Sequence, residues 1–234
     1  MPRLFVEADP GGDRATLGPD GSRHLRALRL APGDEIEAIV GPGDVRRATL
    51  QVFTRRGAEL RLGERVSLGA VDPPRSLVLV AALADLPRFD SVVEKATELG
   101  ATELVPLRAE RSQVGRLTGA RRARWERIAR AACEQCGRTR SPDLRADGVL
   151  EEVLASLPDR SHRVAFDPRA DAPWDGDAPR ELPLVLFIGP EGGFSPREIE
   201  TLKRCGALRR SLGPRILRFE TAAAAALAIA GSRR

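Results

Sequence analysis

The stretch FIGPEGGFSPREIETLKRCGALRRSLGPRILRFETAAAAAL, residues 187–227, decides the fold of this 234-residue chain. It begins inside an apolar run over residues 182–188, which predicts a buried strand. The run ends at Gly189-Pro190-Glu191-Gly192-Gly193, where glycine permits positive φ and lets the backbone approach a ligand. A helix is predicted next, because Ser195 is a favourable N-cap, Pro196 suits the first helical position and Glu198 completes a capping box.

A second Gly-Pro loop follows in the same stretch. Residues 208–212 predict a short strand that leads into Gly213-Pro214-Arg215, and residues 220–230 predict an alanine-rich helix. We expect the two loops to lie side by side, since ligands bind at the carboxyl ends of strands in an open α/β sheet. The alternative is two ordinary strand-to-helix turns.

The two loops differ from the common nucleotide-binding motifs. They contain neither the Lys-Ser/Thr pair of a P-loop nor a GxGxxG pattern. They offer backbone groups beside an apolar wall, which suits an uncharged planar group such as adenine better than a triphosphate. The expected wall consists of Leu186, Ile188, Leu212, Ile216 and Leu217.

Composition sets broad limits on the class of protein. Hydrophobic residues make up 42% of the chain, enough for a substantial core, and 38 basic against 33 acidic residues give a net charge of +5. That charge is a weak indication of a nucleic-acid partner. We find neither a signal peptide nor an apolar run long enough to span a bilayer, so we expect a cytoplasmic protein without a membrane segment.

The cysteines do not predict a metal or redox site. Cys133 and Cys136 form a CxxC, but helical spacing places both on the buried face of a helix, where cysteine behaves as a small apolar residue. A zinc site needs further ligands, and Cys205, His24 and His162 are the remaining Cys and His residues.

The chain divides naturally at Pro73-Pro74. Residues 1–72 show closely spaced short strands, which predict a small β-barrel, and a basic helical turn over residues 22–29. A barrel with such a turn could bind RNA; the alternative is that His24 makes a structural hydrogen bond and the arginines are solvated. Residues 73–234 alternate strands with helices, which is typical of a parallel sheet covered on both faces. The helices expected there, besides those of the two-loop stretch, span residues 89–99, 120–136 and 150–157, and the strands span residues 77–83, 103–107 and 163–166.

The two-loop stretch resembles the C-terminal signature of SPOUT-class methyltransferases, specifically the bacterial 16S rRNA uracil-N3 methyltransferase family. That family shows a GPEGG-F-s-x-x-E loop followed by an LG-x-RILR-x-ETA segment. Three more segments match its motifs: KATELG at residues 95–100, the P-x-x-x-x-R-S pattern at residues 106–112, and the W-x-x-I…E-Q-s-x-R pattern at residues 125–138. The segment HLRALRL at residues 24–30 is similar to its H-x-x-x-V-L-R element.

The resemblance implies an α/β fold with a trefoil-knotted SPOUT domain over residues 73–234 and a PUA- or OB-like β-barrel over residues 1–72. It implies S-adenosylmethionine as methyl donor, 16S rRNA of the small ribosomal subunit as partner, and a homodimer. Two positions depart from the family. Leu83-Ala84-Asp85 lacks the usual lysine, and Phe219 replaces the usual threonine.

The resemblance also assigns roles to residues. The cofactor-binding set is Leu186, Ile188, Gly189, Glu191, Gly192, Gly193, Leu212, Gly213, Arg215, Ile216, Leu217 and Arg218. The RNA-binding set is His24, Arg26, Arg29, Arg111, Ser112 and Arg138.

Methylation at N3 requires an acceptor for one proton. The chain contains no tyrosine and neither histidine lies in the C-terminal motifs, so Glu191 is the expected acceptor, with Glu220 as the other candidate carboxylate. A water or a backbone carbonyl is the alternative. Arg138 and Arg218, or Arg215, are expected to stabilise charge on the uracil oxygens. Two other functions stay open: a ribose 2′-O methyltransferase of the same fold, and a non-catalytic RNA-binding protein, against which the two intact Gly-Pro loops argue.

Overall fold

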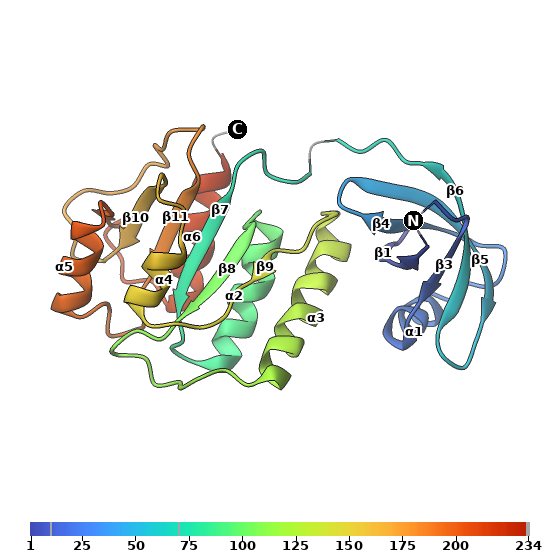
Figure 1. The fold of residues 1–234 in the computed structure, drawn as a ribbon, viewed down its shortest axis with the longest axis horizontal. Helices are drawn as coiled ribbons and strands as arrows, with labels where there is room; N and C mark the ends of the chain where they lie inside the picture. Colours follow the sequence, from blue (N-terminus) through green and yellow to red (C-terminus); the bar gives the residue numbers. More distant parts are fainter. Residues whose placement is uncertain (10, 70, 233–234) are drawn as a thin grey trace. The chain divides into compact units, whose positions relative to one another are not determined.

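A computed structural model describes residues 1–9, 11–69 and 71–232 (Figure 1). The chain divides into two compact units. The first contains Met1–Asp72 together with the mid-chain segment Cys133–Arg140, and the second contains Pro73–Ala132 and Ser141–Arg234. Among the helices described, none is long and apolar enough to cross a membrane.

The first unit is built on one curled six-stranded sheet with the order β1-β4-β5-β6-β3-β2 (Figure 1). Strands β1 and β4 pair in parallel, and the other neighbours are antiparallel. Register shifts between β4 and β5 and between β5 and β6 bend the sheet. The elements are β1 (Arg3–Phe5), β2 (Glu7–Ala8), β3 (Arg14–Leu17), α1 (Pro19–Ala27), β4 (Glu35–Gly41), β5 (Asp44–Phe53) and β6 (Ala58–Arg65).

Alternating side chains form the core of this unit. Along β6, residues point inward and outward in turn, as expected for a strand with one buried face. Leu25 on α1 packs into the same core as Ile36, Leu50 and Leu60 from the strands. Helix α1 starts at Pro19, earlier than predicted, because proline suits the first helical position.

The second unit is built on a six-stranded sheet that is parallel throughout, with the order β12-β10-β11-β7-β8-β9. Every residue of β7 and β11 is buried, since helices cover both faces. The strands are β7 (Leu77–Ala82), β8 (Glu103–Leu107), β9 (Asp143–Leu144), β10 (His162–Phe166), β11 (Leu184–Ile188) and β12 (Leu208–Arg210). The α/β chain with a parallel sheet and a separate curled sheet confirms the predicted fold class.

Two layers of helices cover this sheet. Alternate residues of β7 face opposite layers: Leu79 packs with α2, α3 and α6, and Val80 packs with α4 and α5. The alanine-rich helix α6 lies against α2 and its own sheet. The helices are α2 (Leu86–Glu98), α3 (Gly119–Cys136), α4 (Leu150–Ser156), α5 (Pro196–Arg204) and α6 (Phe219–Ser232).

Three aromatic rings connect the helices of one layer. The ring of Phe89 on α2 stacks on Trp125 of α3, with centroids 4.3 Å apart, and faces Phe219 of α6 at 6.2 Å. Asp90 accepts a hydrogen bond from the Trp125 indole at 2.7 Å. The residue that departs from the family pattern, Phe219, is therefore a core residue, only 3% exposed.

The two strands that carry the Gly-Pro loops are not neighbours in the sheet, although both loops line the same pocket, as expected. Strand β10 pairs with β11 on one side and with β12 on the other. Strand β11 begins two residues later than predicted, at Leu184, and is preceded by Pro183, which has no N–H to donate to a ladder. Strand β12 ends at Arg210, and Ser211 forms only an isolated bridge with Pro173.

Candidate functional site

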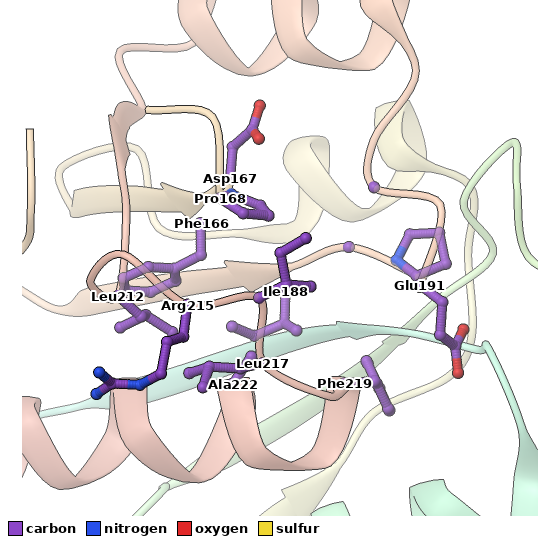
Figure 2. A pocket seen from close by; sticks show the side chains of 14 residues that line it. Phe166, Asp167, Pro168, Ile188, Glu191, Leu212, Arg215, Leu217, Phe219 and Ala222 are labelled. Carbon is purple, nitrogen blue, oxygen red and sulfur yellow. The ribbon is translucent and has the colours of Figure 1, made fainter. Parts of the chain in front are cut away.

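A pocket of about 610 Å³, part of it open to solvent, lies at the carboxyl ends of β10 and β11 in the second unit (Figure 2). The loop between β12 and α6 and the first turn of α6 complete it. The lining residues are Phe166, Asp167, Pro168, Ile188, Gly189, Pro190, Glu191, Gly193, Leu212, Arg215, Ile216, Leu217, Phe219 and Ala222. Its lining of apolar side chains, loop backbone and a few charged groups is typical of a site for a small molecule.

The first loop, Gly189–Gly193, requires glycine at two positions. Gly193 has φ +68°, and its N–H donates to the carbonyl of Pro190 at 2.7 Å. A Cβ on Gly189 would lie 3.1 Å from the backbone nitrogen of Phe194 and against its ring. The loop therefore turns tightly onto the start of α5 and presents its backbone to the pocket.

Two arginines from other elements hold this loop in place. Nη1 of Arg88, on α2, lies 2.7 Å from Oε1 of Glu191, and both side chains are nearly half exposed. Nη1 of Arg111, in the segment after β8, donates to the carbonyl oxygen of Gly192 at 2.6 Å. The expected role of Arg111 was RNA contact, and the structure places its guanidinium on the first loop.

The capping box predicted for α5 is present and does more than cap the helix. Ser195 accepts a hydrogen bond from the Glu198 N–H at 3.1 Å, and Glu198 Oε2 accepts one from the Ser195 N–H at 2.8 Å. Glu198 is 4% exposed, and its Oε1 accepts a hydrogen bond from the Glu110 N–H at 3.0 Å. One buried carboxylate thus ties the start of α5 to the segment after β8.

Strand β10 supplies a part of the pocket that the sequence did not indicate. It ends in Phe166, and Asp167 and Pro168 follow it into the pocket wall. Asp167 Oδ2 lies 2.9 Å from Arg209 Nη2, and its Oδ1 accepts a hydrogen bond from the Arg169 N–H at 2.9 Å. Figure 2 shows Asp167 and Glu191 at separate points around Ile188, so the pocket carries two carboxylates.

Most of the residues predicted to bind a cofactor line the pocket. They are Ile188, Gly189, Glu191, Gly193, Leu212, Arg215, Ile216 and Leu217. The others are not in the lining: Gly192, Gly213 and Arg218 belong to the loops and are adjacent in sequence to lining residues, and Leu186 is fully buried in the core. Arg218 is exposed and its carbonyl accepts from the Ala222 N–H, which starts α6.

The other candidate base, Glu220, does not line the pocket. It lies in the first turn of α6, and its Oε2 is buried without a hydrogen-bond partner among the described residues. Its neighbours Phe219 and Ala222 do line the pocket. Both residues lie within the RILR-x-ETA segment but were not among the predicted cofactor-binding residues. Asp167 carries no motif-specific signal, and only the strand-end rule points to residues that follow β10.

The residues predicted to bind RNA are distributed over both units. In the first unit His24, Arg26 and Arg29 are exposed, and the Arg26 guanidinium lies 4.4 Å from the centroid of Phe53. Arg138 also belongs to the first unit, where it is 3% exposed and its Nε lies 3.2 Å from Asp72.

In the second unit, Ser112 closes a local turn. Its hydroxyl accepts a hydrogen bond from the Ala109 N–H at 3.1 Å. The three cysteines are free thiols, and within residues 1–9, 11–69 and 71–232 no three His, Cys, Asp or Glu side chains are grouped as metal ligands.

Comparison with known proteins places the chain in a family. The profile of the RNA methyltransferase domain matches residues 71–231. The ribosomal RNA small subunit methyltransferase E of Mycobacterium tuberculosis is 32% identical over 95% of this chain and 87% of its own length. The protein of the same name from Neisseria gonorrhoeae, crystallised with S-adenosylmethionine, superposes with a TM-score of 0.88 at 30% identity, over 97% of this chain and 95% of that chain.

A second solved structure agrees with the first. A Legionella pneumophila methyltransferase with bound S-adenosylmethionine superposes with a TM-score of 0.88 at 30% identity, over 99% of this chain and 97% of that chain. Both structures match the first unit as well as the second. The chain therefore belongs to the RNA methyltransferase family, and within it to the ribosomal RNA small subunit methyltransferase E group.

Proposed function

We propose that this protein transfers a methyl group from S-adenosylmethionine to N3 of a uridine in 16S rRNA. The observation that carries the proposal is the pocket between the two Gly-Pro loops, formed by the sequence motifs that resemble the uracil-N3 family. Relatives that match nearly the whole chain are crystallised with S-adenosylmethionine, which supports the choice of donor.

The residues around the pocket fit this cofactor. Ile188, Leu212 and Leu217 provide an apolar wall for an adenine ring, and the loop backbones provide donors and acceptors for its edge. S-adenosylmethionine carries positive charge on its sulfur and its amino group, and the carboxylates of Glu191 and Asp167 complement that charge. When bound, the cofactor supplies the electrophilic methyl group.

The chain itself handles the proton on uracil N3. That proton must leave before or during methyl transfer, so an acceptor within hydrogen-bond reach is needed. We assign this role to Glu191, because it lies on the pocket, is nearly half exposed and is held by Arg88. Asp167 is the weaker candidate, since hydrogen bonds and an ion pair from Arg209 and Arg169 already occupy both its oxygens.

Arginine side chains near the pocket stabilise the negative charge that develops on the uracil oxygens. Arg215 lines the pocket, and Arg218 is exposed three residues later. A guanidinium beside an oxygen that gains charge lowers the barrier most effectively when water is excluded. Arg138 is already ion-paired with Asp72 in the first unit, so we favour Arg215 and Arg218 over it.

The partner and setting follow from the same proposal. The substrate is 16S rRNA of the small ribosomal subunit, and exposed His24, Arg26 and Arg29 are the contacts we propose for the first unit. We also propose a homodimer, as the family resemblance implies, and a cytoplasmic location for it.

Methyl transfer from labelled S-adenosylmethionine to purified small ribosomal subunits tests the proposal directly. Nucleoside analysis of the product should give 3-methyluridine. A 2′-O-methylated nucleoside would instead establish the ribose methyltransferase, and cofactor-independent RNA binding without transfer would establish a non-catalytic binder.

A further inference from the structure

One continuous segment of the second unit is rich in positive charge and lies outside the pocket lining. Residues 111–130 contain seven arginines and a single acidic residue, Glu126. The segment begins after β8 and continues through the first two-thirds of α3. Such a density of arginine on one segment is the electrostatic footprint of a nucleic-acid contact.

This segment starts at the rim of the pocket. Arg111 donates to the carbonyl of Gly192, the residue between lining residues Glu191 and Gly193. From there the chain runs through Arg116 to Thr118, whose carbonyl and hydroxyl accept hydrogen bonds from the Arg121 N–H at the start of α3. The charged segment therefore leads away from the pocket without leaving the second unit.

Helix α3 turns its charged face to solvent. Trp125 and Ala129 are each 1% exposed and pack into the core, whereas Arg124 and Arg127 are exposed. Residues three apart on a helix lie on the same face, so Arg124 and Arg127 form one stripe. An α-helix rises 1.5 Å per residue, so Arg127 lies roughly 12 Å along the helix axis from the start of α3 at Gly119.

The arginines of the segment differ in their existing partners. Arg121 and Arg124 both bind Asp90, at 3.5 and 2.9 Å, and Arg122 binds Glu126 at 3.0 Å. These three help to fix α3 and its surface. Arg116 and Arg127, in contrast, are exposed and make no ion pair within the described residues. An unpaired guanidinium at the surface is available for a phosphate, which it can bind through two parallel hydrogen bonds.

We infer that the segment from Arg111 to Arg127 is a phosphate-binding track for the rRNA strand that carries the target base, with Arg116 and Arg127 as its main contacts. The inference rests on the proposed function and adds the surface over which the substrate lies. A nucleotide whose base enters the pocket is joined to neighbours whose phosphates need positive partners beside the rim. The track provides those positive partners for the phosphates without distinguishing one base sequence of the RNA from another.

The test compares two double variants with the same change of charge. The first is Arg116→Gln with Arg127→Gln. The control is Arg160→Gln with Arg180→Gln, two exposed arginines that precede β10 and β11. They therefore lie near the amino ends of these strands, whereas the pocket lies at the carboxyl ends. A third protein, Arg116→Lys with Arg127→Lys, retains the charge. Binding of a 16S rRNA transcript is measured from about 50 to 200 mM salt, the range over which phosphate contacts weaken steeply.

The first double variant should bind the transcript more weakly, and the slope of log affinity against log salt should be shallower by about 1.4, the value for two single-strand phosphate contacts. The control and the lysine variant should keep the wild-type slope, and all proteins should bind S-adenosylmethionine equally. A wild-type slope in the first variant, with methyl transfer by the wild type intact, overturns the track alone. Failure of the wild type itself to bind or methylate rRNA overturns the proposed function together with the track.

Discussion

The guanidinium of Arg88 and the carboxylate of Glu191 lie 2.7 Å apart and join two helix-strand units of the parallel sheet that are far apart in sequence. Asp85 caps α2 by accepting a hydrogen bond from the Arg88 N–H at 2.9 Å, which fixes the turn that carries Arg88. The family's usual lysine is missing at Leu83-Ala84-Asp85, and Arg88, three residues after Asp85, provides a cation to the pocket loop. The first loop is therefore held by a charge from α2.

Removing that charge should loosen the loop and weaken cofactor binding. For Arg88→Gln we expect the Kd for S-adenosylmethionine, measured by calorimetry, to rise by up to about fivefold, since exposed ion pairs contribute about 0–1 kcal/mol. Arg122→Gln is the matched control, because its pair with Glu126 is exposed to a similar degree and lies away from the pocket. Equal effects of the two substitutions would contradict a specific role for Arg88.

Kinetic measurements should distinguish the roles of the two pocket carboxylates, Glu191 and Asp167. Glu191→Gln removes the proposed proton acceptor and should slow methyl transfer by about 10²- to 10⁴-fold. Its Kd for the cofactor should change only a few-fold, as for Arg88→Gln. Asp167→Asn should raise the Kd more than it lowers the transfer rate, because it weakens the ion pair with Arg209 that holds the end of β10. Full turnover by Glu191→Gln would remove Glu191 as the base.

Two glycines with similar backbone angles give a test of the loop itself. Gly193 and Gly206 have φ +68° and +76°, and a Cβ on either would meet nothing within 4 Å. Alanine at either position should cost about 1–2 kcal/mol of stability, because L-residues are strained at positive φ. Only Gly193→Ala should also weaken S-adenosylmethionine binding, since only Gly193 lines the pocket. Unfolding and calorimetry of both variants make the comparison, and an equal loss of affinity would rule out a local effect.

Restoring the family's threonine should destabilise this chain. Phe219→Thr removes a buried ring that faces Phe89 and leaves a hydroxyl in the core, so we expect a loss of about 3 kcal/mol. Phe53→Thr removes a partly exposed ring in the first unit and should cost less. Thermal unfolding measures both, and a Phe219→Thr protein as stable as the wild type would show that the ring stack contributes nothing.

Stability should depend on pH through His162, the first residue of β10. Burial lowers the pKa of His162, with Arg75 and Arg210 acting in the same direction and Asp177 opposing them. The folded state therefore favours the neutral ring. The stability that the neutral His162 ring contributes is fully present above pH 6.5, the ordinary pKa of histidine. It is lost as the pH falls below 6.5 toward the lowered pKa of the folded state. Unfolding of His162→Gln should show a weaker loss on acidification than the wild type, and identical pH profiles would exclude this residue.

The sequence predicted the parts of the fold that depend on local chemistry. The capping box at Ser195 and Glu198 sets the start of α5, and the apolar run before Gly189 becomes β11. Strands β2 and β3 were missed, because Glu7–Ala8 and Arg14–Leu17 are short and largely polar, and their pairing depends on distant partners.

At the site too, the sequence predicted residues that belong to local motifs but not those that the tertiary fold brings together. Motif residues such as Glu191 and Leu212 were found, whereas Asp167 was not, because only the strand order brings the end of β10 between the two loops. Likewise, nothing around Arg111 or Arg138 in sequence indicates that Arg111 binds the Gly192 carbonyl or that Arg138 pairs with Asp72.

The position of β10 between β11 and β12 also bears on how tightly the ligand binds. Neighbouring strands are about 4.8 Å apart, so two loops separated by one strand stand roughly 10 Å apart. That separation lets each loop contact a different end of one molecule, while Phe166 and Pro168 at the end of β10 also line the pocket. Adenosine and methionine, offered separately, should then bind weakly, whereas a single covalently joined molecule gains from the high effective concentration of its second end once the first is seated.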